Sequence, residues 1–208
     1  MKYKVTKKQN NSNDCIVCGL NTDASLKTAF YELENNTVVG FCTPQNHHQS
    51  YPDRMHGGMI CAILDEVMGR GLQINNSNAW GVTGSIEIKY KKAVPLNKEI
   101  KCVGKITSDR ARVFEGEGFI EDEDGNILAT GKALYFKTNF DALENQEEFG
   151  WKQTLNKIEP TEIEIANMNF FDKNNWIKNF YFNKCGNNFK KVISYYIKKH
   201  VKKITCFF

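Results

Sequence analysis

The stretch that decides the fold is HGGMICAILDEVMGRG, residues 56–71. Its apolar residues recur every three or four positions, which is the spacing of one face of an α-helix. They are Met59, Ile60, Ile63, Leu64, Val67 and Met68. Gly69 and Gly71 mark the expected end of this helix, because glycine is common just past a helix C-terminus. The apolar content predicts a helix that other parts of the chain largely cover.

Strand-like segments lie on both sides of this helix. They are residues 26–33, 37–43, 80–91, 98–107, 112–121 and 127–137. In residues 80–91 a strict alternation assigns Val82, Gly84, Ile86, Ile88 and Tyr90 to one face of the strand. We therefore expect an α+β fold, in which one long central helix is wrapped by a curved antiparallel sheet of about six strands.

Composition divides the chain into three parts. Residues 1–25 form a polar, Asn-rich N-terminal arm that we expect to dock loosely. Residues 26–140 form the predicted domain, and residues 141–208 a basic extension rich in Asn, Lys and aromatic residues. Residues 165–208 carry nine lysines and one acid, a local charge of +8, whereas the whole chain carries +4. The remaining body is mildly acidic, which gives no support for nucleic-acid binding.

Several interpretations of the C-terminal extension are open. Residues 190–204 place isoleucines and a valine on one face and lysines elsewhere, a pattern that fits a basic amphipathic helix touching a membrane surface. The alternative that we favour is a poorly ordered appendage. A frameshift or read-through product is a third interpretation, because Lys, Asn, Phe, Tyr and Ile are what AT-rich DNA encodes by default.

The cysteines and the hydropathy bound the cellular context. The seven cysteines are scattered and odd in number, which favours reduced thiols over a disulfide framework. No apolar run is long enough to cross a membrane, and the basic N-terminus lacks the apolar core of a signal peptide. We expect a cytoplasmic protein. Cys15 and Cys18 form a CxxC with no second pair at ligand spacing, so we expect a local turn or thiol pair and no metal site.

The start of the helix is suited to stabilise negative charge. The first N–H groups of a helix lack intrahelical partners and lie at the positive end of the helix dipole. Gly57 and Gly58 would let a substrate approach this backbone closely. The sequence His56-Gly57-Gly58 therefore fits a site where a carbonyl oxygen becomes an oxyanion, although it also fits any tight turn into a helix.

Two acids follow in the middle of the same helix. Asp65 lies beside the apolar stripe, where a carboxylate is costly without a function, and Glu66 is rotated by about 100° towards solvent or a cation. Asp65 lies eight residues after Gly57, about 12 Å at 1.5 Å per residue, so one carbonyl group cannot touch both. If both serve one reaction, a second copy of the helix must run antiparallel beside the first, which predicts an obligate dimer.

These motifs resemble a known family. The loop HHQSYPDRMHGG, the helix HGGMICAILDEVMG, the strand GVTGSIEIKYKKAVP and the hairpin VFEGEGFIEDEDGNILATGKALYF are similar to those of the PaaI-type hotdog thioesterases, over roughly residues 26–138. The resemblance implies a hotdog fold, assembly as a homodimer or a dimer of dimers, and hydrolysis of acyl-CoA thioesters without a metal or other cofactor.

The resemblance also implies roles for individual residues. Asp65 corresponds to the family's nucleophile or general base, Gly57 to the oxyanion N–H, and His56 to a group that orients the thioester. Thr83 stands where relatives carry a hydroxyl that positions water. Several relatives place Asn or Gln in the loop before the histidine, where this chain has Ser50 with Gln49 beside it. Gly58, Gln49, Arg110 and Arg112 are the expected substrate-binding residues, the two arginines for the CoA phosphates.

Two other functions share this fold. A hotdog hydratase or dehydratase would act on acyl thioesters, but the Gly-His-Phe-Pro-like loop typical of those enzymes is absent. A non-catalytic acyl-CoA-binding module would use the same pocket, and Asp65 and Thr83 argue against it. The acyl group itself is not predicted: Met59, Ile60, Ile63, Trp80 and Phe114 are candidates to line its pocket.

Overall fold

The helix expected from residues 56–71 is present in the computed structural model as α1, Gly57–Gly69. The structure describes residues 1–139, 149–151 and 159–172. Gly69 does not stop the helical path, because the chain tightens into the 3-10 helix η2, Arg70–Ile74. The predicted amphipathic segment 190–204 lies outside the described residues.

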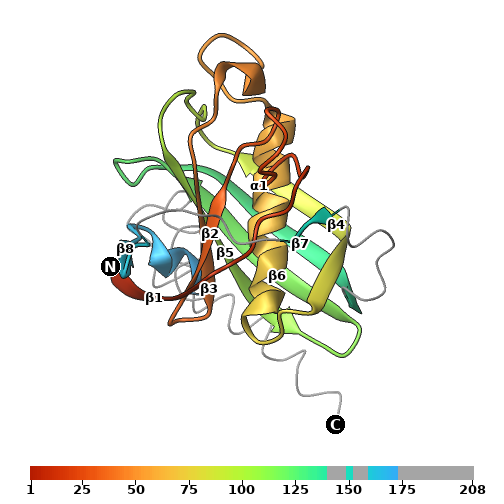
Figure 1. The fold of residues 1–208 in the computed structure, drawn as a ribbon. Coiled ribbons are helices and arrows are strands. Elements are labelled where there is room, and N and C mark those ends of the chain that lie inside the picture. The colour runs from red at the N-terminus through yellow and green to blue at the C-terminus, as the bar shows by residue number, and fades with distance from the viewer. Residues whose placement is uncertain (140–148, 152–158, 173–208) are drawn as a thin grey trace, which may run out of the picture. The chain divides into compact units, whose positions relative to one another are not determined.

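The sheet is antiparallel throughout and has eight strands in the order β4-β7-β6-β5-β3-β2-β1-β8. The strands are β1 Lys2–Lys8, β2 Ala29–Leu33, β3 Thr37–Cys42, β4 Ala79–Tyr90, β5 Ile100–Asp109, β6 Val113–Glu121, β7 Ile127–Asn139 and β8 Glu162–Glu164. α1 lies across the curved sheet, with β4 at one edge (Figure 1). The predicted hotdog fold, one long helix against a curved antiparallel sheet, is confirmed.

The number of strands differs from the expected six because two segments outside residues 26–140 join the sheet. β1 pairs with β2, with Val5 opposite Leu33, and β8 pairs with β1, with Tyr3 opposite Ile163. β1 alternates lysines with apolar side chains only over residues 2–5, a run too short to identify a strand by itself. Its place in the sheet therefore rests on backbone pairing with a neighbour that is distant in sequence.

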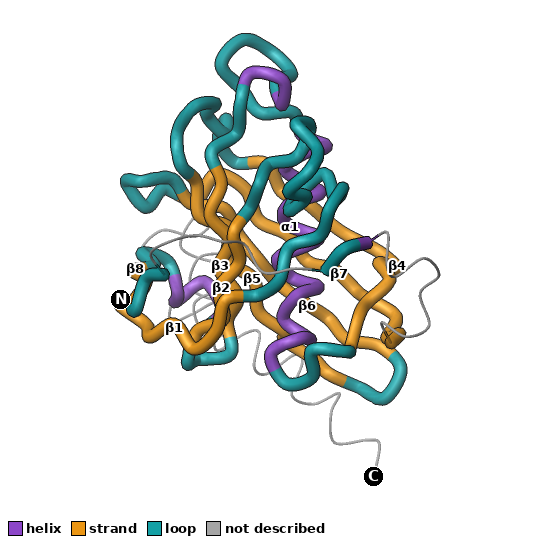
Figure 2. Tube along the Cα trace, in the orientation of Figure 1, coloured by secondary structure: helices purple, strands orange, loops and turns teal. Residues whose placement is uncertain are grey.

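The segment between β1 and β2 is drawn largely as loop in Figure 2, yet it is not loosely docked. Asn11 is completely buried, and its side-chain amide donates to the carbonyl oxygens of Cys18 at 2.7 Å and Thr28 at 2.9 Å. Val17 and Cys18 belong to the hydrophobic core. The expectation of a loosely docked arm is wrong because these polar side chains replace water with backbone partners and can therefore be buried.

The helix packs closely on the middle of the sheet. Ile63, Leu64, Val67 and Met68 have no more than traces of exposed surface. A side chain at Gly104 on β5 would collide with the backbone of Val67, so the absence of a side chain at Gly104 lets the strand approach the helix. This packing fixes the rotation of α1 and leaves the Asp65 side partly exposed.

The contacts divide the chain into two units, residues 1–167 and 168–208. All eight strands and α1 belong to the first unit. The described part of the second unit is the 3-10 helix η4, Met168–Phe171, and Asp172. None of the helices in the described ranges has both the length and the apolar character that a membrane span requires.

Candidate active site

The N-terminus of α1 is capped by the histidine that precedes it. His56 has an extended backbone, and its Nδ1 accepts a hydrogen bond of 2.9 Å from the Gly58 N–H. In the described ranges no group accepts a hydrogen bond from the Gly57 N–H, as expected for the first residue of a helix. The Tyr90 hydroxyl on β4 donates to the Gly57 carbonyl oxygen at 3.0 Å. Of the two glycines, Gly57 therefore has the N–H that is available to a ligand.

Asp65 and Thr83 lie together, as the sequence predicts for a shared site. The Thr83 hydroxyl on β4 is 3.0 Å from each carboxylate oxygen of Asp65 and can donate to either. The Tyr135 hydroxyl on β7 donates to the backbone carbonyl oxygen of Asp65 at 2.8 Å. Two neighbouring strands thus hold the middle of α1 at the position of this acid.

The surroundings of Asp65 change its acidity. Burial raises the pKa of the Asp65 carboxyl, and the hydrogen bond from Thr83 opposes part of that rise. Burial, with the negative charge of Asp65 nearby, also raises the pKa of Tyr135, so this phenol stays protonated and remains a donor. A carboxylate with a raised pKa is a stronger base than an exposed aspartate, which suits general base catalysis near neutral pH.

An irregularity in β4 turns Thr83 towards the helix. β4 pairs regularly with β7 from Tyr90 to Ser85, and the register then shifts between Ser85 and Thr83, with Gly84 as the extra residue. The expected alternation assigned Val82 to the same face as Ile86. The bulge reverses the phase, so Ile86 packs against the core while Val82 is 57% exposed. Thr83 can reach Asp65 only because of this reversal.

Asp65 and Thr83 border a cavity of about 310 Å³. Its far wall is aromatic: the rings of Trp80 and Phe149 pack edge to face at 5.4 Å, and Phe149 stacks on Trp151 at 5.5 Å. Cys15 and Ile16 of the segment between β1 and β2 also line it. Of the candidate pocket residues, only Trp80 lines this cavity. Ile60, Ile63 and Phe114 are buried in the core, and Met59 packs against it.

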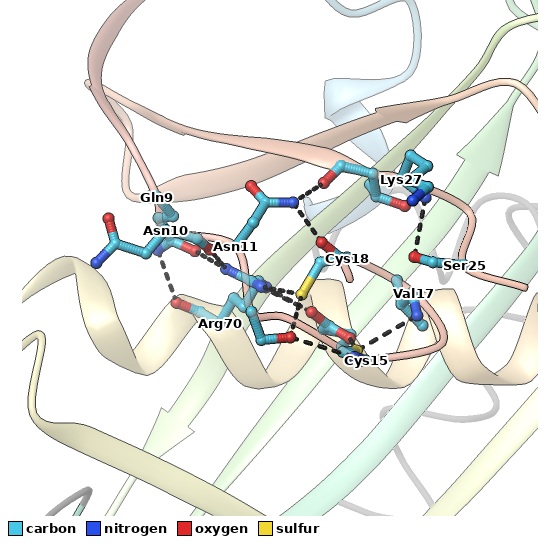
Figure 3. Close-up of polar contacts among 12 residues, drawn as sticks. Gln9, Asn10, Asn11, Cys15, Val17, Cys18, Ser25, Lys27 and Arg70 are labelled. Carbon is cyan, nitrogen blue, oxygen red and sulfur yellow. Dashed lines mark hydrogen bonds and ion pairs between the residues drawn. The ribbon is translucent and has the colours of Figure 1, made fainter. Parts of the chain in front are cut away.

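Glu66 is paired with a cation, as the sequence analysis preferred. The Arg70 guanidinium donates to Glu66 Oε1 through Nε at 3.0 Å and Nη2 at 2.7 Å. The same guanidinium donates to the Asn10 carbonyl oxygen at 3.0 Å and to Cys18 Sγ at 3.2 Å (Figure 3). Arg70 therefore ties the segment between β1 and β2 to the C-terminal end of α1.

The other predicted substrate-binding residues lie away from Asp65 or on the surface. Gln49 is exposed, where its backbone bridges to Met55, and the Gly58 N–H is taken by His56. Arg110 lies in the β5–β6 turn, paired with Glu115 at 3.5 Å, and Arg112 lies at the end of the same turn. A role of these four residues in binding a substrate stays a prediction.

The loop before the helix is organised by a histidine that the sequence did not single out for this purpose. His48 is buried, its Nδ1 accepts from the Gln45 N–H at 2.9 Å, and its Nε2 lies 3.0 Å from the Ala24 carbonyl oxygen. Burial lowers the pKa of His48, which keeps the ring neutral. The His48 carbonyl oxygen accepts from the His56 N–H at 2.8 Å and so positions the start of α1.

Sequence reasoning missed four aromatic contributors to the site. Tyr90 and Tyr135 read as ordinary strand aromatics, and their contacts with helix carbonyls depend on register. Phe149 and Trp151 lie after the predicted domain, within the predicted C-terminal extension of residues 141–208. The only sequence signal for these two residues was the pattern itself, two large aromatic residues separated by the single residue Gly150.

Residues 53–129 match the family model of the thioesterase superfamily. Among solved structures, a thioesterase superfamily protein is 24% identical to this chain with a TM-score of 0.51. The match covers 54% of this chain and 55% of that protein. Zebrafish thioesterase superfamily member 2 is 16% identical with a TM-score of 0.51, and the match covers 57% of this chain and 88% of the zebrafish protein. A Haemophilus influenzae thioesterase is 10% identical with a TM-score of 0.53, and the match covers 59% of this chain and 85% of that thioesterase. No curated protein matches the sequence. At these identities the likeness concerns the fold.

Proposed function

We propose that this protein, whose residues 53–129 match the model of the thioesterase superfamily, hydrolyses acyl-CoA thioesters to the free acid and CoA. The observation that carries the proposal is the contact between the half-buried Asp65 carboxylate and the Thr83 hydroxyl at the mouth of a cavity. A carboxylate with a raised pKa beside a hydroxyl is the arrangement needed to hold and activate water.

In the proposed reaction the thioester carbonyl lies at the N-terminus of helix α1 of one protomer. The Gly57 N–H donates to the carbonyl oxygen and stabilises the negative charge that forms on it. In one route Asp65 removes a proton from a water that Thr83 orients, this water attacks the carbonyl carbon, and the CoA thiolate leaves with the free acid formed. In the other route the Asp65 carboxylate attacks the carbonyl carbon, the CoA thiolate leaves, and water then hydrolyses the mixed anhydride to the free acid and Asp65. His56 orients the thioester from the cap of the helix, with its Nε2 free to donate because Nδ1 is engaged by Gly58.

The site requires two chains, because Gly57 and Asp65 lie eight residues apart on one helix, about 12 Å. Two features support a two-fold pair. β4 is a twelve-residue edge strand, and an unpaired edge is a template for another strand. The partly exposed side of α1 carries small residues, Gly58, Cys61 and Ala62, which permit close approach of a second helix. We propose that Gly57 of one protomer faces Asp65 of its partner.

The test is release of free thiol from a panel of acyl-CoAs. We expect Asp65→Asn to lose at least about 100-fold in kcat while binding of the substrate persists, because the amide keeps the shape of the carboxylate but cannot act as base or nucleophile. Thr83→Val is the matched comparison and should lose less, since it removes only the orienting hydroxyl. Normal hydrolysis by Asp65→Asn would refute the assignment.

A non-catalytic binding module is the alternative outcome of the same assay. If the wild-type chain binds acyl-CoA in equilibrium dialysis but releases no thiol from any member of the panel, the cavity serves binding alone. The length and character of the acyl chain would then be read from the affinities.

A further inference from the structure

The CxxC of the segment between β1 and β2 is brought to the wall of the same cavity as Asp65. The sulfur atoms of Cys15 and Cys18 and a carboxylate oxygen of Glu66 all lie within 4.8 Å of one another. Both cysteines line the cavity of about 310 Å³, and both are reduced. The proposed hydrolysis uses neither thiol.

The turn that carries the two thiols is held by its own hydrogen bonds. The Gly19 N–H donates to the Cys15 carbonyl oxygen at 2.7 Å, and the Val17 N–H donates to Cys15 Sγ at 3.3 Å. A side chain at Gly19 would collide with the Cys15 backbone, so the tight turn needs glycine there. The two sulfur atoms are therefore close before any reaction.

The two thiols differ in their surroundings (Figure 3). Cys15 Sγ donates to Glu66 Oε2 at 3.1 Å, whereas Cys18 Sγ accepts from Arg70 Nη2 at 3.2 Å. The side-chain contact with Cys15 and the charge of Arg70 lower the pKa of Cys18, against the effects of burial and of the charge of Glu66. The contact with Cys18, burial and the charge of Glu66 raise the pKa of Cys15. Cys18 thus has the character of an attacking thiolate and Cys15 that of a resolving thiol.

A metal ion fits this cluster less well than a redox reaction. Three donor groups are available, but Arg70 already neutralises Glu66 and contacts Cys18. A divalent cation placed among them would be repelled by the buried guanidinium. The same guanidinium favours a thiolate, which is the reactive form of cysteine.

We propose that Cys15 and Cys18 form a reversible disulfide in response to a small hydroperoxide. The Cys18 thiolate attacks one oxygen of hydrogen peroxide, the O–O bond breaks, and hydroxide leaves, which gives a sulfenic acid on Cys18. Cys15 then attacks the Cys18 sulfur, the S–O bond breaks, and the hydroxide leaves with the proton of Cys15 as water. Two thiols and one peroxide give one disulfide and two waters, and the two electrons pass from sulfur to peroxide.

Disulfide formation would alter the cavity as well as the turn. Once oxidised, Cys15 has no proton to donate to Glu66, and its sulfur moves towards Cys18 and away from the wall shared with Asp65. Cys15 makes no hydrogen bond with Asp65 in the described ranges. We therefore expect oxidation to change KM and leave kcat nearly unchanged, an expectation that rests on the proposed hydrolysis.

The experiment maps thiols in the reduced full-length chain after treatment with one equivalent of hydrogen peroxide. Trypsin releases residues 9–27 with both cysteines and residues 55–70 with Cys61, a half-buried thiol that serves as the internal control. We expect peptide 9–27 to lose two hydrogen atoms and both alkylation sites before Cys61 is modified, and dithiothreitol to restore them. Cys15→Ser and Cys18→Ser should each abolish this product.

Two results would overturn the proposal. One is peptide 9–27 recovered with two free thiols after Cys61 has been oxidised. The other is binding of one equivalent of Zn²⁺ that is lost in Cys15→Ser, which would make the cluster a metal site. The mapping does not depend on catalysis, so failure of the proposed hydrolysis leaves it interpretable. A disulfide that forms without any change in KM would refute the link to the cavity.

Discussion

Replacing Arg70 by methionine would remove the cation that joins α1 to the segment between β1 and β2. The Arg70 side chain is 5% exposed and that of Glu66 is 20% exposed, so the pair is largely removed from water. The guanidinium also lies 4.1 Å above the ring of Phe30, where methionine keeps much of the apolar contact. The substitution therefore tests the charge and its hydrogen bonds more than the packing.

The expected loss of stability follows from the groups that Arg70 leaves without their partner. Without Arg70, the Glu66 carboxylate loses its cation and the donors to Oε1, and the Asn10 carbonyl oxygen loses the guanidinium donor; breaking a buried pair on one side costs about 3–5 kcal/mol. At the lower end this corresponds to a fall in Tm of about 6–12 °C for a chain of this size. The double substitution Arg70→Met with Glu66→Gln should recover part of the loss, since it removes the unpaired charge.

The assay is urea unfolding followed by circular dichroism, with the free energy of unfolding taken at equal m-values. Arg110→Met is the matched control, because Arg110 pairs with Glu115 on the surface, where the two side chains are 66% and 41% exposed. That control should change stability by no more than about 0.5 kcal/mol. If Arg70→Met lowers the free energy of unfolding no more than the control does, Arg70 does not stabilise the contact between α1 and the segment between β1 and β2 as described.

Three further predictions concern the site. Because Asp65 must be ionised and burial raises its pKa, kcat/KM should fall as pH drops through a value above the usual aspartate range near 3.9, and Thr83→Val should move that limb to higher pH. A profile with no acid limb in that range would count against Asp65 as the base. Gly57→Pro removes the N–H at a helix position that tolerates proline, after a residue with an extended backbone. Co-expressed with Asp65→Asn, it should restore about a quarter of wild-type activity through heterodimers, and no recovery would exclude a composite site. Val82→Lys charges the exposed edge strand and should give monomers in sedimentation, whereas a persisting dimer would place the interface elsewhere.

The sequence predicts the fold well wherever a local pattern carries it. The apolar spacing of residues 59–68 places α1 within two residues of its observed ends, and the turn signals separate the strands correctly. The family resemblance, and not spacing, assigns Asp65 and Thr83 to one site; the structure brings their side chains into contact, and their roles stay predictions. These features depend on short-range periodicity or on motif, which one sequence displays directly.

What the sequence does not predict depends on pairing between distant segments. The polar segment between β1 and β2 looks like a solvated arm, and only the partners of Asn11 and Arg70 explain its burial. Phe149 and Trp151 could not be assigned to the cavity because nothing local relates them to Trp80. The roles of Gly57, His56, Gln49, Gly58, Arg110 and Arg112 remain predictions, to be tested on the assembled protein.

The extra residue in β4 has a consequence for the register of this strand. If Gly84 paired with β7 instead of bulging, the residues before it would slide by one position, so that Thr83 would face outwards and Val82 would face Asp65. Every side chain named in the site would still be encoded, yet the hydroxyl would be on the wrong side of the strand. Deleting Gly84 would not have this effect, because Ser85 and Thr83 already pair with the consecutive residues Leu134 and Tyr135. A relative that pairs this strand without the bulge could therefore retain a threonine at the aligned position and still have lost its contact with the acid.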